Sequence, residues 1–123
     1  MKLRLKENSI RFRLLRSEVT TLAERGAVYE TIQFGPTDDD IFTYSIVASD
    51  EVTEISAHFL HNRMLVKVPE RVAREWALHE QVGLEASQVV GEDGALLKIL
   101  IEKDFVCIGR PDDPDNADAF PIV

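Results

Sequence analysis

The chain has little of what marks covalent, membrane or secreted proteins. It contains one cysteine, Cys107, in 123 residues, which excludes an internal disulfide and fits a reducing compartment. No window approaches the ~18 consecutive apolar residues that span a bilayer. Charged residues occupy the start of the chain, where a signal peptide would be apolar. We therefore expect a soluble, cytoplasmic protein without a membrane partner.

The sequence also lacks the short motifs that identify a reaction. There is no Gly-x-Ser-x-Gly, no Walker-type loop and no His-Glu-x-x-His. His58 and His61 lie three positions apart at a predicted strand end, where such side chains point to opposite faces, so they do not predict a metal site. Cys107 stands between Val106 and Ile108 and is expected to be a buried structural residue. We predict no catalytic residue, no cofactor and no metal.

What the chain does have is an uneven distribution of charge. The formal net charge is −8, but the first 16 residues hold six of the 14 basic side chains and one of the 22 acidic ones. The acidic remainder argues against nucleic-acid binding, which depends on contacts with phosphates. Five of the six basic residues alternate with apolar ones at a period of two, which places them on one face of a strand. This basic stripe consists of Lys2, Arg4, Lys6, Arg11 and Arg13.

Alternation and turn residues predict an α+β fold. The predicted strands are 2–6, 9–15, 27–34, 41–48, 55–60, 64–68, 84–90 and 95–102, and the first two are expected to form one long bent strand. Helices are predicted over 17–25 and from Pro69 onward. Hairpin-length connections favour one curled, mainly antiparallel sheet of about seven strands, a half-open barrel in form, with two short helices. We expect a single domain, 1–123, with an irregular acidic tail at about 109–123 and no internal repeat.

The basic stripe is the best candidate for a functional site. A row of like charges needs acidic partners or an anionic ligand, and the arginine fork binds phosphate and carboxylate groups well. We predict that Arg11 and Arg13 contact the ligand and that Asn8 is a hydrogen-bonding neighbour. The leading hypothesis is a small non-enzymatic domain that binds an anionic ligand or a protein partner through this face.

Two alternatives remain open. In the first, the protein is an enzyme that acts on a phosphorylated or carboxylated small molecule, with Arg11 and Arg13 holding the anion and Glu85 or Glu102 as general base. Carboxylates beside arginines usually have lowered pKa values, which makes them poor bases near neutral pH. In the second, the protein is a structural domain that associates with itself, and its oligomeric state would identify it.

Two stretches of the chain resemble a small bacterial family whose members have about this length and no known function. They are Glu7-Asn8-Ser9-Ile10-Arg11 near the start and Glu102-Lys103-Asp104-Phe105, followed by Cys107, near the end. The resemblance implies a free-standing bacterial cytoplasmic domain and carries no activity with it. A weaker similarity, to the triphosphate-tunnel enzymes, rests on the basic stripe alone. Their Glu-x-Glu-x-Lys strand would correspond to Lys2-Leu3-Arg4-Leu5-Lys6, which has no carboxylate.

Overall fold

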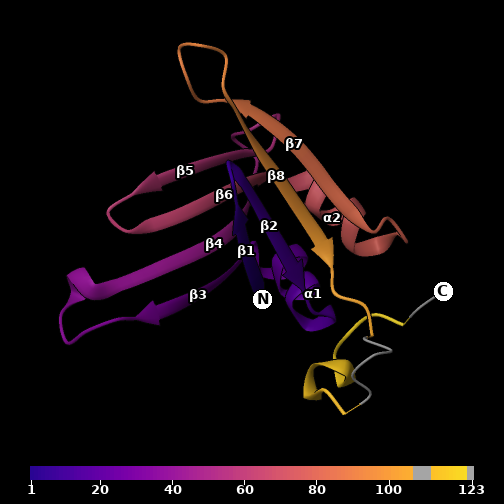
Figure 1. The fold of residues 1–123 in the computed structure, drawn as a ribbon. Coiled ribbons are helices and arrows are strands. Elements are labelled where there is room, and N and C mark those ends of the chain that lie inside the picture. Colours follow the sequence, from indigo (N-terminus) through magenta and orange to yellow (C-terminus); the bar gives the residue numbers. More distant parts are fainter. Residues whose placement is uncertain (107–111, 122–123) are drawn as a thin grey trace.

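The computed structural model describes residues 1–106 and 112–121. These ranges form eight strands, two α-helices and two short 3₁₀ helices (Figure 1). The strands are β1 (Lys2–Lys6), β2 (Ser9–Leu14), β3 (Ala27–Gln33), β4 (Ile41–Ser49), β5 (Ser56–Leu60), β6 (Arg63–Pro69), β7 (Gly83–Val89) and β8 (Leu96–Lys103). The helices are α1 (Arg16–Arg25) and α2 (Glu70–Leu78), with 3₁₀ turns η1 (Asp38–Asp40) and η2 (Pro114–Ala117). The predicted strands and both predicted helices are present.

The strands form two four-stranded sheets, not the single sheet of about seven strands that the sequence predicted. Sheet A has the order β1-β2-β8-β7 and sheet B the order β3-β4-β6-β5. The outer pairs in each sheet are antiparallel, whereas the central pairs, β2 with β8 and β4 with β6, are parallel. In each parallel pair at least one other strand lies between the two partners in sequence, so no hairpin pattern predicts the pairing. The α+β class is confirmed, but the sheets are mixed and do not close into a barrel.

The chain is built from two halves with the same order of elements. The first half runs β1-β2-α1-β3-β4 and the second runs β5-β6-α2-β7-β8. Each half contributes its first hairpin to one sheet and its second hairpin to the other. Figure 1 shows the strands of the two sheets crossing steeply, with both helices beyond one end of sheet B. The halves are therefore interlocked, and neither sheet is complete without both.

Equivalent hydrogen bonds recur in the two halves. The carbonyl of Asn8 accepts from Lys98 N at 3.1 Å, and that of Asn62 accepts from Thr43 N at 3.1 Å. The amide side chains match as well: Asn8 Nδ2 donates to Leu96 O and Asn62 Nδ2 donates to Asp39 O. The two halves thus share a register, although the sequence shows no repeat.

The turn at Glu7 and Asn8 corrects another expectation. It reverses the chain, so β1 and β2 are an antiparallel hairpin in which Lys6 faces Ser9, not one bent strand. Glu7 has φ of 52°, and His61 has φ of 51° at the equivalent position. A two-residue turn whose first residue has a positive φ is enough for a hairpin. The extra reversal explains why eight strands form where about seven were expected.

The core fills the space between the sheets and extends under the helices. Phe12 of β2, Ile46 of β4 and Val66 of β6 are fully buried, because alternate residues of these strands face inward. Trp76 of α2 and Leu22 of α1 bring the apolar helix faces into the same cluster. Each such side chain contributes about 1.5–3 kcal/mol through burial. This common core fixes the outer faces of both sheets.

Part of the predicted acidic tail packs against the start of α1. Asp118 accepts hydrogen bonds from the backbone and hydroxyl of Ser17 and, through its carbonyl, from Arg16 N. Phe120 N donates to Asp104 O just beyond β8. The tail therefore packs where β8 of sheet A ends, next to the start of α1. Cys107, with the prediction made for it, lies outside the described residues.

Candidate functional site

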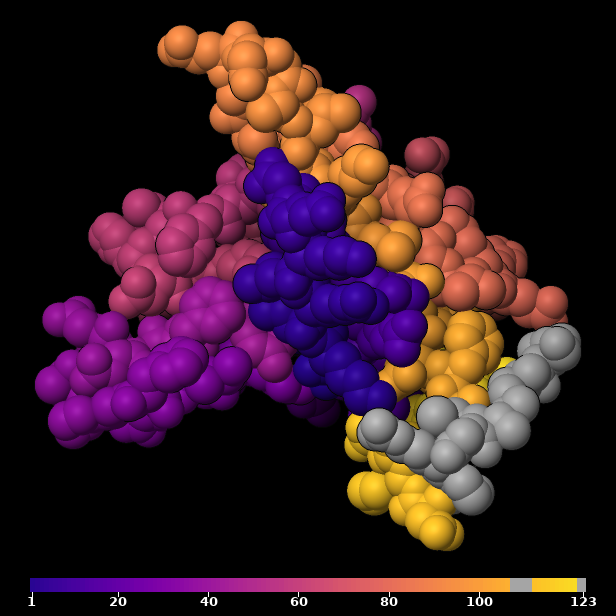
Figure 2. Space-filling view, in the orientation of Figure 1, coloured from indigo at the N-terminus to yellow at the C-terminus, as the bar shows by residue number. Residues whose placement is uncertain are grey.

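The basic stripe lies on the outer face of sheet A. Lys2 is paired with Arg13 and Arg4 with Arg11 across the β1–β2 hairpin, so their side chains share one side of the sheet. Ile10 and Phe12 between them are buried on the other side. In Figure 2 the residues of this hairpin, in indigo, form the front of the molecule. The predicted one-sided arrangement of the basic residues is thus present.

A hollow of about 600 Å³ opens on this face beside β2. Arg11 and Lys98 line it together with the hydroxyl side chains of Ser9 and Ser87. Glu85 adds one carboxylate. Because Ser9 pairs with Lys98 and Ser87 pairs with Lys98 from the other side, these three residues form a row across the sheet. Cations flanked by hydroxyls suit the oxygens of a phosphate or carboxylate.

Only part of the basic stripe is neutralised by acidic neighbours. Arg11 Nε contacts Glu102 Oε1 at 2.5 Å, and Lys2 Nζ lies 3.0 Å from Asp104 Oδ2. The hydrogen bond to Asp104 raises the pKa of Lys2. No ion pair within the described ranges involves the other three basic side chains of the face on β1 and β2, or the one on β8. These four are Arg4, Lys6, Arg13 and Lys98.

The three predicted contact residues lie in different surroundings in the structure. Arg11 lines the hollow, whereas Arg13 lies farther along β2, opposite Lys2. Asn8 is in the turn, and its amide already donates to Leu96 O at 2.7 Å. Lys98 also lines the hollow, but sequence reasoning missed it. The signal was a single cation within an apolar run of β8, and only the parallel pairing of β8 with β2 brings it into the same hollow as Arg11.

A partly buried polar network ties β1 to sheet B. The amino group of Met1 lies 2.6 Å from Glu18 Oε2 and 2.6 Å from Glu30 Oε1. Burial opposes its charge, but hydrogen bonds to the two carboxylates raise the pKa of this amino group. Tyr44 Oη donates to Glu30, and burial together with this bond raises the pKa of Tyr44 to about 12. Burial likewise opposes ionisation of Glu30, yet these hydrogen bonds lower its pKa. The network is a structural link with every partner engaged.

Lys103 is a buried cation on the inner face of sheet A. Its Nζ donates to His79 O at 2.6 Å, just after α2, and lies 5.7 Å from the centre of the Trp76 ring. A second ring, that of Phe120, is 5.3 Å from the same atom. Burial lowers the pKa of Lys103. The contacts fit a residue that satisfies the carboxyl end of α2, where a cation is favoured.

The remaining predictions concern metals and membranes. Among residues 1–106 and 112–121, no group of three or more His, Cys, Asp or Glu side chains is placed to hold a metal ion. His58 Nε2 is instead 3.0 Å from Ser56 Oγ on β5. No helix in the same ranges has the length and apolar character needed to cross a bilayer.

Sequence reasoning missed a second concave surface, on the outer face of sheet B. This sheet-B groove has a volume of about 1130 Å³, and all four strands of the sheet line it. Its walls and floor combine apolar side chains with two basic ones from β6, Arg63 and Lys67. The visible signal for this surface in the sequence was the alternation of Arg63, Leu65 and Lys67 with the buried residues of β6. It resembles that of Arg11 and Arg13, but only the sheet places Tyr29, far away in sequence, on the same face.

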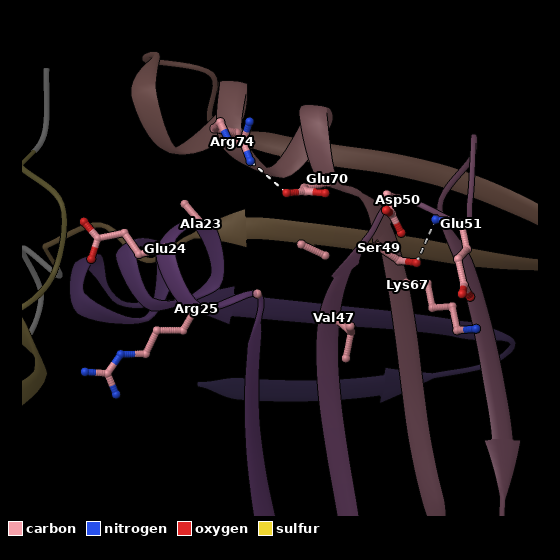
Figure 3. A pocket seen from close by; sticks show the side chains of 12 residues that line it. Ala23, Glu24, Arg25, Val47, Ser49, Asp50, Glu51, Lys67, Glu70 and Arg74 are labelled. Atoms are coloured by element: carbon pink, nitrogen blue, oxygen red, sulfur yellow. Dashed lines mark hydrogen bonds and ion pairs between the residues drawn. The ribbon is translucent and has the colours of Figure 1, made fainter.

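A smaller polar pocket lies at the corner where α1 ends and α2 begins (Figure 3). Its volume is about 560 Å³, and its charged lining includes Arg25, Lys67, Glu51 and Glu70. Glu70 pairs with Arg74 at 2.8 Å. Positive and negative side chains are mixed around this corner, so the pocket favours neither an anionic nor a cationic ligand.

The fold and these surfaces define a small α+β domain in which two interlocked mixed sheets expose unlike outer faces. The chain belongs to a family of unknown function, DUF7009, whose model matches residues 1–122. The predicted resemblance to a family without known function is therefore confirmed. No match was found among curated proteins or among solved structures.

Proposed function

We propose that the chain is a binding domain that holds a small phosphate- or carboxylate-bearing ligand on the outer face of sheet A. The observation that carries this proposal is that Arg4 lies directly opposite Arg11, the arginine that lines the hollow. Like charges directly opposite each other destabilise a sheet. A bound anion would remove that cost, and no acidic side chain in the described ranges pairs with Arg4.

The side chains around the hollow support the same ligand class. Glu102 engages Nε of Arg11, which fixes the guanidinium. Among the described residues, no protein group forms a hydrogen bond with its two terminal nitrogens. Lys98 adds a second cation, and Ser9 and Ser87 add hydroxyl groups. A fixed guanidinium beside hydroxyls binds an oxyanion with less loss of side-chain freedom than a mobile one.

An enzyme acting on such a ligand is the second candidate, because Glu85 lines the same hollow as Arg11. Its carboxylate would be the general base, whereas Glu102 is held by Arg11. The observation that favours simple binding is that Glu85 is the one carboxylate among the described residues that line the hollow. Phosphorus NMR of inorganic triphosphate incubated with the protein separates the two: appearance of shorter phosphates would favour the enzyme.

Calorimetry and thermal unfolding at low salt, with inorganic triphosphate and with citrate, test the proposal. A ligand at ~100 times its dissociation constant should stabilise the protein by ~2.7 kcal/mol. The double variant Arg4→Gln with Arg11→Gln should lose both the heat of binding and the stabilisation.

The matched control is Arg16→Gln with Arg71→Gln, which removes two exposed arginines from the helices and the same amount of charge. It should bind as the original protein does. The proposal fails if neither anion binds, or if the control variant loses as much affinity as the sheet-A variant.

A further inference from the structure

The sheet-B groove has an apolar floor that is open to ligands. Leu65 of β6 lies in its middle, Val47 of β4 lies toward the helices, and Ile41 lies toward the hairpin tips. Tyr29 and Leu60 stand at the two edges and are each 69% exposed. Exposed apolar side chains that line one concavity are typical of a ligand-binding surface.

Two basic side chains interrupt this apolar surface. Arg63 and Lys67 are two residues before and after Leu65 on β6, so all three point to the same face. At ~3.3 Å per residue, the backbones of Arg63 and Lys67 are ~13 Å apart, a span that two long side chains can bridge around one anionic group. Within the described ranges neither takes part in an ion pair. Figure 3 shows Lys67 beside Val47 at the end of the groove nearest the helices.

The rest of the lining adds hydroxyl groups and little negative charge. Thr31 pairs with Thr43 across β3 and β4, and Ser45 is the next groove residue along β4. His58 lies opposite Leu65 on β5. Asp38 is the one acidic residue among the described groove residues. In a protein of net charge −8, this face is therefore locally basic.

We propose that the sheet-B groove binds a small amphipathic anion: an apolar chain or ring that carries one carboxylate or phosphate group. The apolar part lies over Leu65, Val47 and Tyr29, and the anionic group is held between Arg63 and Lys67. A purely apolar ligand would leave both cations unpaired, which is costly once water is excluded. A small hydrophilic anion would leave the apolar floor uncovered. Only a ligand with both parts matches the whole lining, and this class differs from the ligand proposed for sheet A.

Calorimetric titration with hexanoate, octanoate and decanoate, below the concentrations at which they form micelles, tests this proposal. Affinity should rise several-fold with each added pair of carbons, because each methylene buried in the groove is transferred from water. 1-Octanol, which has the same chain without the charge, should bind at least tenfold more weakly than octanoate. Equal affinity for octanoate and octanol would overturn the role of the cations, and no rise with chain length would overturn that of the apolar floor.

Variants locate the site. Arg63→Gln with Lys67→Gln should weaken octanoate binding at least tenfold, and the single charge reversal Arg63→Glu, at an exposed position, should do the same. The variant Arg4→Gln with Arg11→Gln is the matched control and should bind octanoate normally while losing inorganic triphosphate. Octanoate binding that survives in both groove variants, or that disappears in the sheet-A variant, would contradict a separate site in sheet B.

Discussion

The outer faces of the two sheets occupy equivalent places in the two halves, but they carry different side chains. β2 beside β8 in sheet A corresponds to β6 beside β4 in sheet B. Where sheet A presents Arg11 next to Leu100, sheet B presents Leu65 next to Ser45. The shared backbone fixes where a concave face forms, and the residues at alternate strand positions decide what it binds. We therefore propose a hydrophilic anion as the ligand of the charged face and an amphipathic anion as the ligand of the apolar one.

The sheet edges differ as well. β1 is joined to β3 by the Met1 amino group, which contacts Glu30. On the opposite side, the amide of Gln88 bonds both N and O of Ala57, on the edge strand β5. Such pairing occupies an edge that would otherwise be open to another chain. The two halves are thus alike in their backbone and different in the polar contacts that hold them together.

The largest expected effect comes from the shared core. Trp76→Ala should cost about 3–5 kcal/mol of unfolding free energy and Leu22→Ala, its counterpart on α1, about 2–5 kcal/mol, because each leaves a cavity. Chemical denaturation measures both, with Leu78→Ala on the exposed side of α2 as control, expected within about 0.5 kcal/mol of the original. If only one of the two core variants is destabilised, the halves do not share a core.

Tyr44 lies on the buried face of sheet B, whereas Tyr29 lies on its exposed outer face. Tyr44→Phe removes the hydrogen bond to Glu30 and should cost about 2 kcal/mol. Because the folded state raises the pKa of Tyr44 from 10 to about 12, its contribution is complete below pH 10 and is lost as the pH rises toward 12. Tyrosinate absorbance of a Tyr29→Phe variant follows Tyr44 alone. Ionisation near pH 10 in the folded protein would contradict the buried contact.

Lys103 sets the inner face of sheet A apart from that of sheet B, where its counterpart is Ala48. The two positions are equivalent because the backbone N–H of Lys103 donates to Val82 O, and that of Ala48 donates to Gly26 O, each in the segment after the preceding helix. Lys103→Ala should cost about 1–3 kcal/mol, because it leaves His79 O without its donor and removes the stem packed near Trp76. Since burial lowers the pKa of Lys103, the original protein should gain stability as the pH rises toward 10.5, and the variant should not. Denaturation at several pH values measures this difference. An identical pH profile would contradict it.

The smallest expected effect concerns the like-charged pair. Arg4→Glu places opposite charges across β1 and β2 and should raise stability by about 0.5 kcal/mol at low salt, with a smaller gain at high salt. His58→Glu, at the equivalent position opposite Leu65, should bring no such gain. Denaturation at two salt concentrations compares them. A loss of stability in the Arg4 variant would show that the pair is not repulsive.

Local patterns predicted the elements but not their assembly. Alternation located β1 and β2, and Ser17 and Gly26 bounded α1 to within a residue. Nothing local indicates that residues 9–14 pair in parallel with 98–103, because that contact depends on the interlocking of the halves. The one-sided basic stripe followed from period two alone. Lys98 and the sheet-B groove did not, because their lining comes from strands that only the tertiary fold brings together.

One NMR titration tests the central claim, that equivalent faces of the two sheets bind different anions. Backbone amide shifts are recorded first with inorganic triphosphate and then with octanoate added to the same sample. Triphosphate should move the amides around Arg11 and Lys98, and octanoate those around Leu65 and Thr43, each without disturbing the other set. Both ligands moving one set, or neither moving any, would contradict the account.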